Sequence, residues 1–400
     1  MELAFWIISF SILFIYGGYG LCIWLYNKAF GVKNDLFPTQ HSPLPKVTLL
    51  IAAYNEEDYI AQKLENSLNL DYPSDKLEIV VVSDGSDDQT VEIVNQFKQV
   101  RSLYEPARNG KIHAIHRAMQ FVESEITIFT DANCMLNKEA ILNIAKHFQD
   151  SQVGAVSGEK RIHVRKESKS NAHGEGLYWK IESKLKTIDY QFHSVVGAAG
   201  ELFAIRTDLY EPVPSDSILD DFAITLSINL RGYKTAYAPD AYAIEHASSE
   251  AGEEFKRKVR IAAGGWQMVN RLVWKMNPIK HPKLALIYYV HRASRWIYGP
   301  FALVAVFLIN LALTFDGSIL YKLLFGLQVI FYLVAILGHS WRNKVLPLKG
   351  ILVPYYLTFM NVAVVAGFFR FLRNKQDVRW DRAQRESSER LITDSVASIV

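Results

Sequence analysis

The chain opens on a long apolar run and carries three more near its end. Residues 3–26 contain no charged side chain, and at ~1.5 Å per residue a helix of that length reaches about 36 Å, enough to cross the hydrocarbon core of a bilayer. A cleaved signal peptide would need a basic start, a shorter apolar run and a small-residue cleavage site, which this segment lacks. The pattern predicts a transmembrane helix over 1–27 and about three membrane segments within 281–372, at about 297–315, 318–338 and 350–369.

Basic residues beside these runs predict which side of the membrane each one faces. Lys28 and Lys33 follow the first run, so the positive-inside rule places the next part of the chain in the cytoplasm and the N-terminus outside. Three late crossings would then send the basic tail, 373–400, outside, against the same rule. We therefore expect 350–369, which contains Pro354, to be interfacial or re-entrant.

The stretch 284–296 mixes an apolar face with His291, Arg292 and Arg295. This composition suits a helix that lies in the lipid headgroup layer. The same residues suit the first turns of the following span equally well, so the sequence leaves both alternatives open.

The middle of the chain, 46–280, has a different pattern. After a Pro-containing linker within 28–45, short apolar runs rich in β-branched residues alternate with stretches that repeat apolar residues at helical spacing. Strands that are apolar on both faces and separated by helices form a parallel sheet, which is covered on both sides and binds ligands at the carboxyl ends of its strands. The predicted strands are 47–54, 77–85, 101–106 and 125–133, and the predicted helices are 57–69, 88–99, 111–122 and 138–149.

Composition narrows the setting. Of the 400 residues, 50% are hydrophobic and 12% are aromatic, a high share for a soluble chain, which agrees with contact between the chain and a lipid bilayer. The net charge of +3 is small and the basic residues form no interleaved stripe, so nucleic acid is not expected as a partner. Cys22 and Cys134 are the only cysteines. They can build neither a disulfide framework nor a zinc site, and they suit a reducing cytosol.

Acidic side chains follow three of the predicted strands. Glu56 comes after the first strand, Asp84 after the second, and Asp131 ends the buried run ITIFTDAN. Because the carboxyl ends of parallel strands share one edge of a sheet, these side chains are expected to converge there. Helix capping could explain Asp87 or Asp88, but it does not explain acids at three strand ends.

Carboxylates at such an edge would repel a phosphorylated ligand unless a divalent cation stood between them. The spacing Asp131-x-Asn133 supplies two hard oxygen ligands, which suit Mg²⁺ or Mn²⁺. The predicted ligand is therefore a nucleoside diphosphate derivative. The chain has no glycine-rich Walker loop and no GxGxxG after the first strand, which argues against an ATPase and against a dinucleotide-binding enzyme.

Six stretches follow one another within 46–265: AAYNEE, VVSDGSDD, NGKIHAIHRA, TDAN, GAAGELFAIR and LDDFAITLSINLRGYKTAYAPDA. In that order they resemble the membrane-bound family-2 glycosyltransferases of the GT-A fold, which include the synthases of cellulose, chitin, hyaluronan and poly-N-acetylglucosamine. The resemblance implies an α/β, Rossmann-like GT-A domain over 46–280 with flanking transmembrane α-helices. It also implies a multi-pass protein of the cell inner membrane whose cytoplasmic domain transfers a sugar, with inversion, from a nucleotide sugar to a polysaccharide or lipid-linked acceptor. A UDP-sugar is the implied donor.

The resemblance also implies roles for single residues. Those implied at the nucleotide sugar are Tyr54, Glu56, Asp84 and Lys111, with Lys258 and Arg260 at its diphosphate. Those implied on the acceptor side are Gly200, Glu201 and Asp220. Asp131 and Asn133 would bind the Mg²⁺ or Mn²⁺ ion, although asparagine is neutral where the family has a second acid. His116 stands where many relatives have asparagine.

Asp221 is the residue that the resemblance implies for the chemistry. It would act as the general base that takes the proton of the acceptor hydroxyl while that oxygen attacks the sugar. Its position in the sequence also suits the N-cap of a helix over 221–230, and the two roles are compatible.

Two features leave the activity open. The stretch 257–261 stands where processive synthases carry Gln-x-x-Arg-Trp, and Trp266 lies five residues beyond it. Processive synthesis with polymer export and single sugar additions therefore stand as alternatives, and so does a catalytically silent membrane partner of a polysaccharide assembly. Membrane partner subunits are possible in each case. Tyr178 and Trp179, in the amphipathic stretch 177–191, are interpreted as core or membrane-interface residues.

Overall fold

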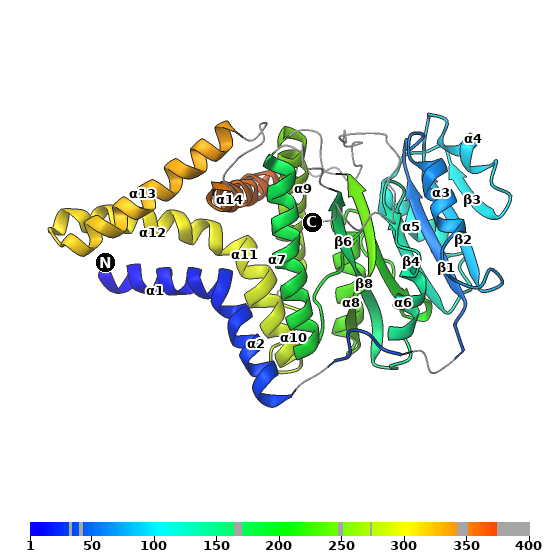
Figure 1. Ribbon diagram of the computed structural model, residues 1–400, viewed down its shortest axis with the longest axis horizontal. Helices are drawn as coiled ribbons and strands as arrows, with labels where there is room; N and C mark the ends of the chain where they lie inside the picture. The colour runs from blue at the N-terminus through cyan, green and yellow to red at the C-terminus, as the bar shows by residue number, and fades with distance from the viewer. Residues whose placement is uncertain are drawn as a thin grey trace.

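The computed structural model describes residues 1–31, 34–39, 43–163, 170–246, 251–272, 274–341 and 351–373. An α/β body lies at one end of the molecule, and apolar helices extend from the other end (Figure 1). The α/β domain with flanking apolar helices that the sequence predicts is therefore confirmed.

The body is built on one eight-stranded sheet in the order β3-β2-β1-β4-β7-β6-β8-β5. Its first half is parallel, as the sequence predicts, because β1 pairs with β2 and β4 while β2 pairs with β3. These strands are β1 (Val47–Ala53), β2 (Leu77–Asp84), β3 (Val100–Glu105) and β4 (Ile126–Asp131). The others are β5 (Met135–Leu136), β6 (Val153–His163), β7 (Leu202–Arg206) and β8 (Lys234–His246).

The second half of the sheet is mixed. β7 runs antiparallel to both β4 and β6, while β6 pairs with β8 in parallel and β5 pairs with β8 antiparallel. The chain enters β7 at the edge where β4 ends, since Thr130 pairs with Leu202. This half contains none of the four strands that the sequence predicts. Because β7 runs antiparallel to β4, the residues just before β7 lie beside Asp131 at the end of β4.

Helices cover both faces of the sheet. The central strands send alternate residues into two cores, with Leu50 and Val80 on one face and Leu49 and Ile79 on the other. A run that is apolar without alternation needs such two-sided burial. The helices are α3 (Ile60–Leu68), α4 (Thr90–Val94), α5 (Lys111–Met119), α6 (Ala140–His147) and α8 (Asp220–Leu230), with a short 3-10 turn over Thr207–Leu209.

Four helices of the described residues are long and apolar enough to cross a membrane, and they correspond to the four predicted apolar runs. In Figure 1, α1, α12 and α13 extend away from the sheet. The first helix consists of α1 (Glu2–Leu13), a π-helical turn (Phe14–Gly18) and α2 (Tyr19–Phe30). The others are α12 (Gly299–Leu313) with a 3-10 turn (Thr314–Asp316), α13 (Ile319–Ser340) and α14 (Leu352–Leu372).

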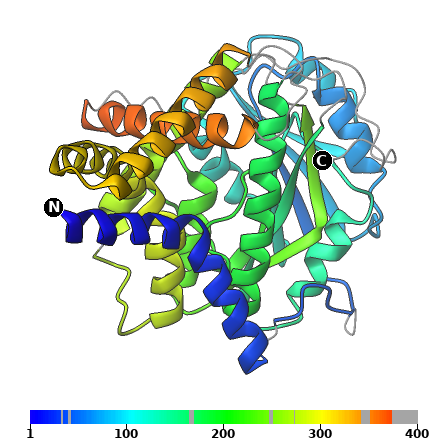
Figure 2. The ribbon, with the colours of Figure 1, turned by 60° about the vertical axis from the view of Figure 1, so that its left-hand side comes forward.

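A long helix, α7 (Ser170–Phe192), lies between the sheet and the membrane helices beside α9 (Ala251–Leu272) (Figures 1 and 2). The Tyr19 hydroxyl of α2 donates to Asp189 of α7 at 2.7 Å. This buried hydrogen bond therefore ties α7 to the first of the four apolar helices.

The segment at 284–296 is also tied to α7. It forms α10 (Pro282–Leu286), a π-helix (Ile287–Ala293) and α11 (Ser294–Ile297). Arg292 and Arg295 donate to Glu182, and His291 contacts Asp189. These basic side chains thus face α7 rather than lipid headgroups, because a carboxylate as buried as Glu182 requires cationic partners.

Candidate active site

The turn after β1 is bound to the turn after β2. Asn55 has a left-handed backbone, with φ of 52°, and its N–H donates to the Ser86 hydroxyl at 3.1 Å. Its side-chain amide donates to Asp87 at 2.6 Å and accepts the Asp87 N–H at 3.0 Å. The N–H of Glu56 donates to the Thr90 hydroxyl at 2.8 Å. These bonds hold the ends of the two strands together as one rim.

Asp84 braces the turn that leads into α5. Its two carboxylate oxygens accept the N–H groups of Asn109 at 2.9 Å and Gly110 at 2.8 Å. Gly110 has φ of 98°, a conformation that favours glycine. In the same turn, the guanidinium of Arg108 lies 3.8 Å from the centre of the Tyr54 ring. Asp84 therefore fixes the start of α5 and, with it, the position of Lys111.

Lys111, the first residue of α5, joins two acids from different elements. Its Nζ lies 2.6 Å from Asp131 Oδ1, at the end of β4, and 3.8 Å from Asp220 Oδ2, at the start of α8. Burial disfavours the charged form of Lys111, but Asp131 and Asp220 outweigh burial and raise its pKa. The Lys111 ammonium group thus links the end of β4 to the start of α8, the helix that carries Asp221.

Asp221 lies in the first turn of α8, beside Asp220. Burial, followed by the charge of Asp220, raises the pKa of Asp221 to about 7. The residue before the helix is Leu219, so Asp221 does not occupy the N-cap position that its sequence also suited. The backbone of Gly200 packs against this carboxylate, since a methyl group at Gly200 would lie 3.4 Å from Asp221 Oδ2. A carboxylate with a pKa near neutrality is suited to proton transfer.

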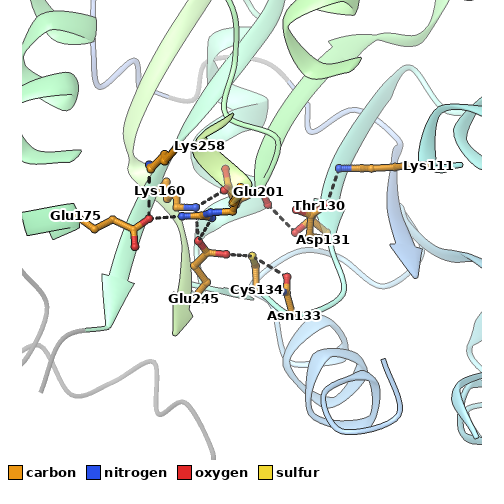
Figure 3. Close-up of polar contacts among 11 residues, drawn as sticks. Lys111, Thr130, Asp131, Asn133, Cys134, Lys160, Glu175, Glu201, Glu245 and Lys258 are labelled. Carbon is orange, nitrogen blue, oxygen red and sulfur yellow. Dashed lines mark hydrogen bonds and ion pairs between the residues drawn. The ribbon is translucent and has the colours of Figure 1, made fainter. Parts of the chain in front are cut away.

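A chain of polar contacts leads from this centre toward α7 and α9 (Figure 3). The Thr130 hydroxyl donates to the backbone carbonyl of Glu201 at 2.8 Å, and the Glu201 carboxylate is bonded by Lys160. Lys160 is almost fully buried and also contacts Glu245. The backbone of Glu201, a residue that the resemblance implied on the acceptor side, thus lies beside the end of β4, and its carboxylate is held by a lysine.

The same series of contacts continues to Lys258, one of the two residues that the resemblance implied at the diphosphate. Arg257 of α9 bonds both Glu245, at 3.2 Å, and Glu175 of α7. Lys258 Nζ lies 3.9 Å from Glu175 Oε1 and is buried. Arg260 lies on the same helix. The structure therefore places Lys258 in the ionic cluster between α7 and α9, while Lys111, Asp131, Asp220 and Asp221 form the centre.

Sequence reasoning missed Lys160, Glu175 and Glu245 as members of this cluster. Lys160 lies in β6 within the charged run Glu159-Lys160-Arg161, and Glu245 lies beside His246 at the end of β8, so no local signal in the sequence singled them out. Tyr210 was missed as well. Its ring lies 6.2 Å from that of His116, and burial followed by the charge of Asp220 raises the pKa of Tyr210.

The acids at the centre suit a divalent cation. Asp131, Asp220 and Asp221 lie around a single ammonium group, and burial raises the pKa of Asp131 even with Lys111 in contact. Among the described residues, the buried Oδ2 of Asp220 has no hydrogen-bond partner. The Oδ1 of Asn133 accepts from the Cys134 thiol at 3.4 Å. No group of three or more His, Cys, Asp and Glu side chains that could hold a metal ion is found in the described part of the chain.

Comparison with known proteins gives matches over most of the chain. The family described as "Glycosyltransferase like family 2" matches residues 45–299. A poly-beta-1,6-N-acetyl-D-glucosamine synthase from Staphylococcus epidermidis is 26% identical over 316 residues, which cover 74% of this chain and 73% of the relative. A synthase of the same name from Staphylococcus aureus is 26% identical over 275 residues, which cover 64% and 63%.

Among solved structures, the mannosyltransferase PcManGT from Pyrobaculum calidifontis, determined with GDP-Man and Mn²⁺, has a similar fold. The TM-score is 0.69 at 24% sequence identity, and the match covers 92% of this chain and 99% of the other. This likeness extends over the α/β body and the apolar helices together.

Proposed function

Because the chain belongs to the glycosyltransferase-like family 2 and is a hexosyltransferase of the GT-A fold, we propose that it transfers a sugar from a UDP-sugar to a polysaccharide or lipid-linked acceptor. The observation that carries this proposal is the contact of Lys111 with both Asp131 and Asp220, directly beside Asp221. The names of the Staphylococcus relatives make UDP-N-acetylglucosamine the first donor to test.

In this proposal Asp221 is the general base. It takes the proton of the acceptor hydroxyl while that oxygen bonds to the anomeric carbon and the bond to the diphosphate breaks, so the anomeric centre is inverted. With a pKa of about 7, a substantial share of Asp221 is ionised near neutral pH, and the ionised form can accept a proton. Asp220 supports this role because its negative charge helps to raise the pKa of Asp221.

The donor would lie along the rim formed by the ends of β1 and β2. We assign Tyr54 and Glu56 to the nucleotide, and Asp84 to the turn that carries Lys111. Asp131 and Asn133 would hold a Mg²⁺ or Mn²⁺ ion, which would stabilise negative charge on the departing diphosphate as a Lewis acid. Lys111 supplies a fixed positive charge at the same place.

The number of sugars added is the open part of the proposal. Trp266, the tryptophan that lies beyond 257–261, packs 4.6 Å from Phe368 and 6.2 Å from Phe301 between ring centres. It therefore belongs to the contact of α9 with α12 and α14. The altered stretch 257–261 favours single additions, whereas the names of the Staphylococcus relatives, which are polysaccharide synthases, favour repeated additions.

Transfer from the cytoplasmic face can be tested with membrane vesicles of defined orientation. Inverted vesicles that contain the full-length protein are supplied with radiolabelled UDP-N-acetylglucosamine, UDP-glucose or GDP-mannose, none of which crosses a bilayer. We expect one donor to label membrane or glycan material in inverted vesicles and not in right-side-out vesicles. Chromatography of the product then separates single additions from polymer. No transfer in either orientation with any donor would favour the catalytically silent partner.

The protein is a membrane protein, and we infer that α1–α2, α12 and α13 cross the bilayer while α14 lies along its cytoplasmic surface. Figure 1 shows α14 foreshortened where α12 and α13 run across the view, and Figure 2 shows it lengthwise. A methyl group at Gly367 of α14 would lie 2.9 Å from the backbone of Ala263 in α9, so α14 packs directly on a helix of the catalytic body. The basic segments 342–350 and 374–400 lie outside the described residues, and the positive-inside rule predicts that both are cytoplasmic, which agrees with the inferred topology.

Cysteine labelling tests this topology. In a Cys22→Ala background, Asp316→Cys marks the turn between α12 and α13, and Arg373→Cys marks the end of α14. Both positions are exposed. A membrane-impermeant maleimide is expected to label Asp316→Cys only in right-side-out vesicles and Arg373→Cys only in inverted vesicles. Labelling of both from the outside would mean that α14 crosses the membrane.

A further inference from the structure

Two buried hydrogen-bond donors on α7 lie close together with no acceptor in the described part of the chain. Lys186 is 2% exposed, and its Nζ has no hydrogen-bond partner there. The indole N–H of Trp179 is also buried and unpartnered. The Lys186 Nζ lies 5.7 Å from the centre of the Trp179 ring. Buried polar groups are nearly always hydrogen-bonded, so two unpaired donors in one place indicate a site for an acceptor group.

The carboxylates nearest Lys186 are bonded by other groups. Glu159 accepts the hydroxyls of Ser183 and Tyr237. Glu182 is bonded by two arginines and Glu201 by Lys160. Burial lowers the pKa of Lys186, and the charge of Glu159 opposes this only in part. Among the described residues Lys186 thus has no ion-paired carboxylate, and its Nζ lies 5.6 Å from the centre of the Tyr237 ring and 5.7 Å from that of Trp179.

This pair of donors is linked to the catalytic centre. Lys160, which bonds Glu201, lies 5.2 Å from the same Trp179 ring, and Lys258 lies 5.8 Å from it. Glu201 follows Gly200, whose backbone packs against Asp221. The donors are therefore connected to Asp221 through Lys160, Glu201 and Gly200, and the ammonium groups of Lys160, Lys186 and Lys258 all lie near the indole ring.

We propose that Lys186 and the Trp179 indole N–H form a subsite for an oxyanion carried by the acceptor, behind its reacting hydroxyl. The inference rests on the proposed transferase function and narrows its acceptor to an anionic one. An indole N–H and an ammonium group can only donate, so their partner must present acceptor oxygens, and a charged oxygen forms the stronger bond. The phosphate of a lipid carrier and the carboxylate of an acidic sugar share this chemistry.

Binding of inorganic phosphate tests the subsite without any need for turnover. The Tm of the full-length protein in detergent is measured against phosphate concentration for wild type, Lys186→Met, Trp179→Phe and Lys184→Met, with UDP and Mn²⁺ present. Lys184 is exposed on the same helix and serves as the matched control. We expect phosphate to raise the Tm of wild type and Lys184→Met and to raise that of the other two variants much less. Equal responses in wild type and Lys186→Met would overturn the proposal.

The variant is expected to fold. A buried ammonium group without a partner is destabilising, so Lys186→Met should have a Tm at or above that of wild type when phosphate is absent. Lys186→Arg keeps the charge and is expected to retain part of the phosphate response. If Lys186→Met cannot be purified, the phosphate response of Trp179→Phe is compared with that of wild type, and equal responses overturn the proposal.

Kinetics identify the source of the oxyanion. Three acceptors are compared: a neutral oligosaccharide, the same oligosaccharide ending in a uronic acid, and a prenyl-phosphate-linked sugar. Lys186→Met is expected to raise KM for one anionic acceptor by about 10- to 100-fold and to leave KM for the donor and for the neutral acceptor unchanged. An equal change for all acceptors, or none, contradicts the subsite. If wild type uses no acceptor but still shows the Lys186-dependent phosphate response, the transferase proposal fails and the subsite stands.

Discussion

An Asp221→Asn variant is expected to lose ~10²- to 10⁴-fold of its sugar transfer while it still binds the donor. Asparagine has the size of aspartate but cannot accept the proton of the acceptor hydroxyl. The measurement is kcat for the full-length protein with a radiolabelled donor, beside donor affinity from calorimetry. Asp208→Asn, at an exposed position before α8, is the matched control and should transfer at the wild-type rate.

Stability and pH separate a catalytic role of Asp221 from a structural one. Its pKa of about 7 lies above the value of an exposed aspartate, so above pH 7 the buried charge destabilises the folded protein. The amide variant should therefore have an equal or higher Tm at pH 8. In wild type, kcat/KM should fall as the pH falls through about 7, because Asp221 takes up a proton. Asp220→Asn removes the negative charge beside Asp221, so the fall in kcat/KM on the acidic side should shift to lower pH. Undiminished turnover in Asp221→Asn would mean that Asp221 is not the base.

The strands that carry the donor rim could be predicted from the sequence because their signal is local. β1, β2 and β4 are apolar on both faces and end in polar residues, and only a central parallel strand needs that pattern. The direction of β7 could not be predicted in this way. LFAIR indicates a strand, but its antiparallel course depends on where α7 returns the chain, which is a long-range packing property.

The candidate site likewise combines features that could be predicted from the sequence with features that depend on long-range packing. The convergence of Asp131 and Asp84 at one edge follows from strand topology, although the structure gives Asp84 the task of bracing the turn before Lys111. The contact of Lys111 with both Asp131 and Asp220 joins three elements and has no local signal. Likewise, Lys258 belongs to a charge run in sequence, and only the packing of α9 on α7 buries it against Glu175.

The second large loss of sugar transfer is expected for Asp131→Asn. Replacing it by asparagine removes the carboxylate proposed to bind the metal ion and leaves the ammonium group of Lys111 without its closest partner. Lewis-acid stabilisation is worth several kcal/mol, so transfer should fall by roughly 10²- to 10³-fold. In wild type, EDTA should stop transfer and Mn²⁺ should restore it, whereas Mn²⁺ should not restore Asp131→Asn. Asp75→Asn, at an exposed position before β2, should behave as wild type.

In the proposed active site, acids from separate strand and helix ends gather around one metal ion and the diphosphate of the donor. Crystals of the full-length protein grown with Mn²⁺ and UDP test this most directly through anomalous scattering. We expect a manganese peak in contact with the Asp131 carboxylate, close to Lys111 and Asp220, with the uridine beside Tyr54. A manganese peak and nucleotide bound elsewhere, with Asp131 and Lys111 still paired to each other, would contradict it.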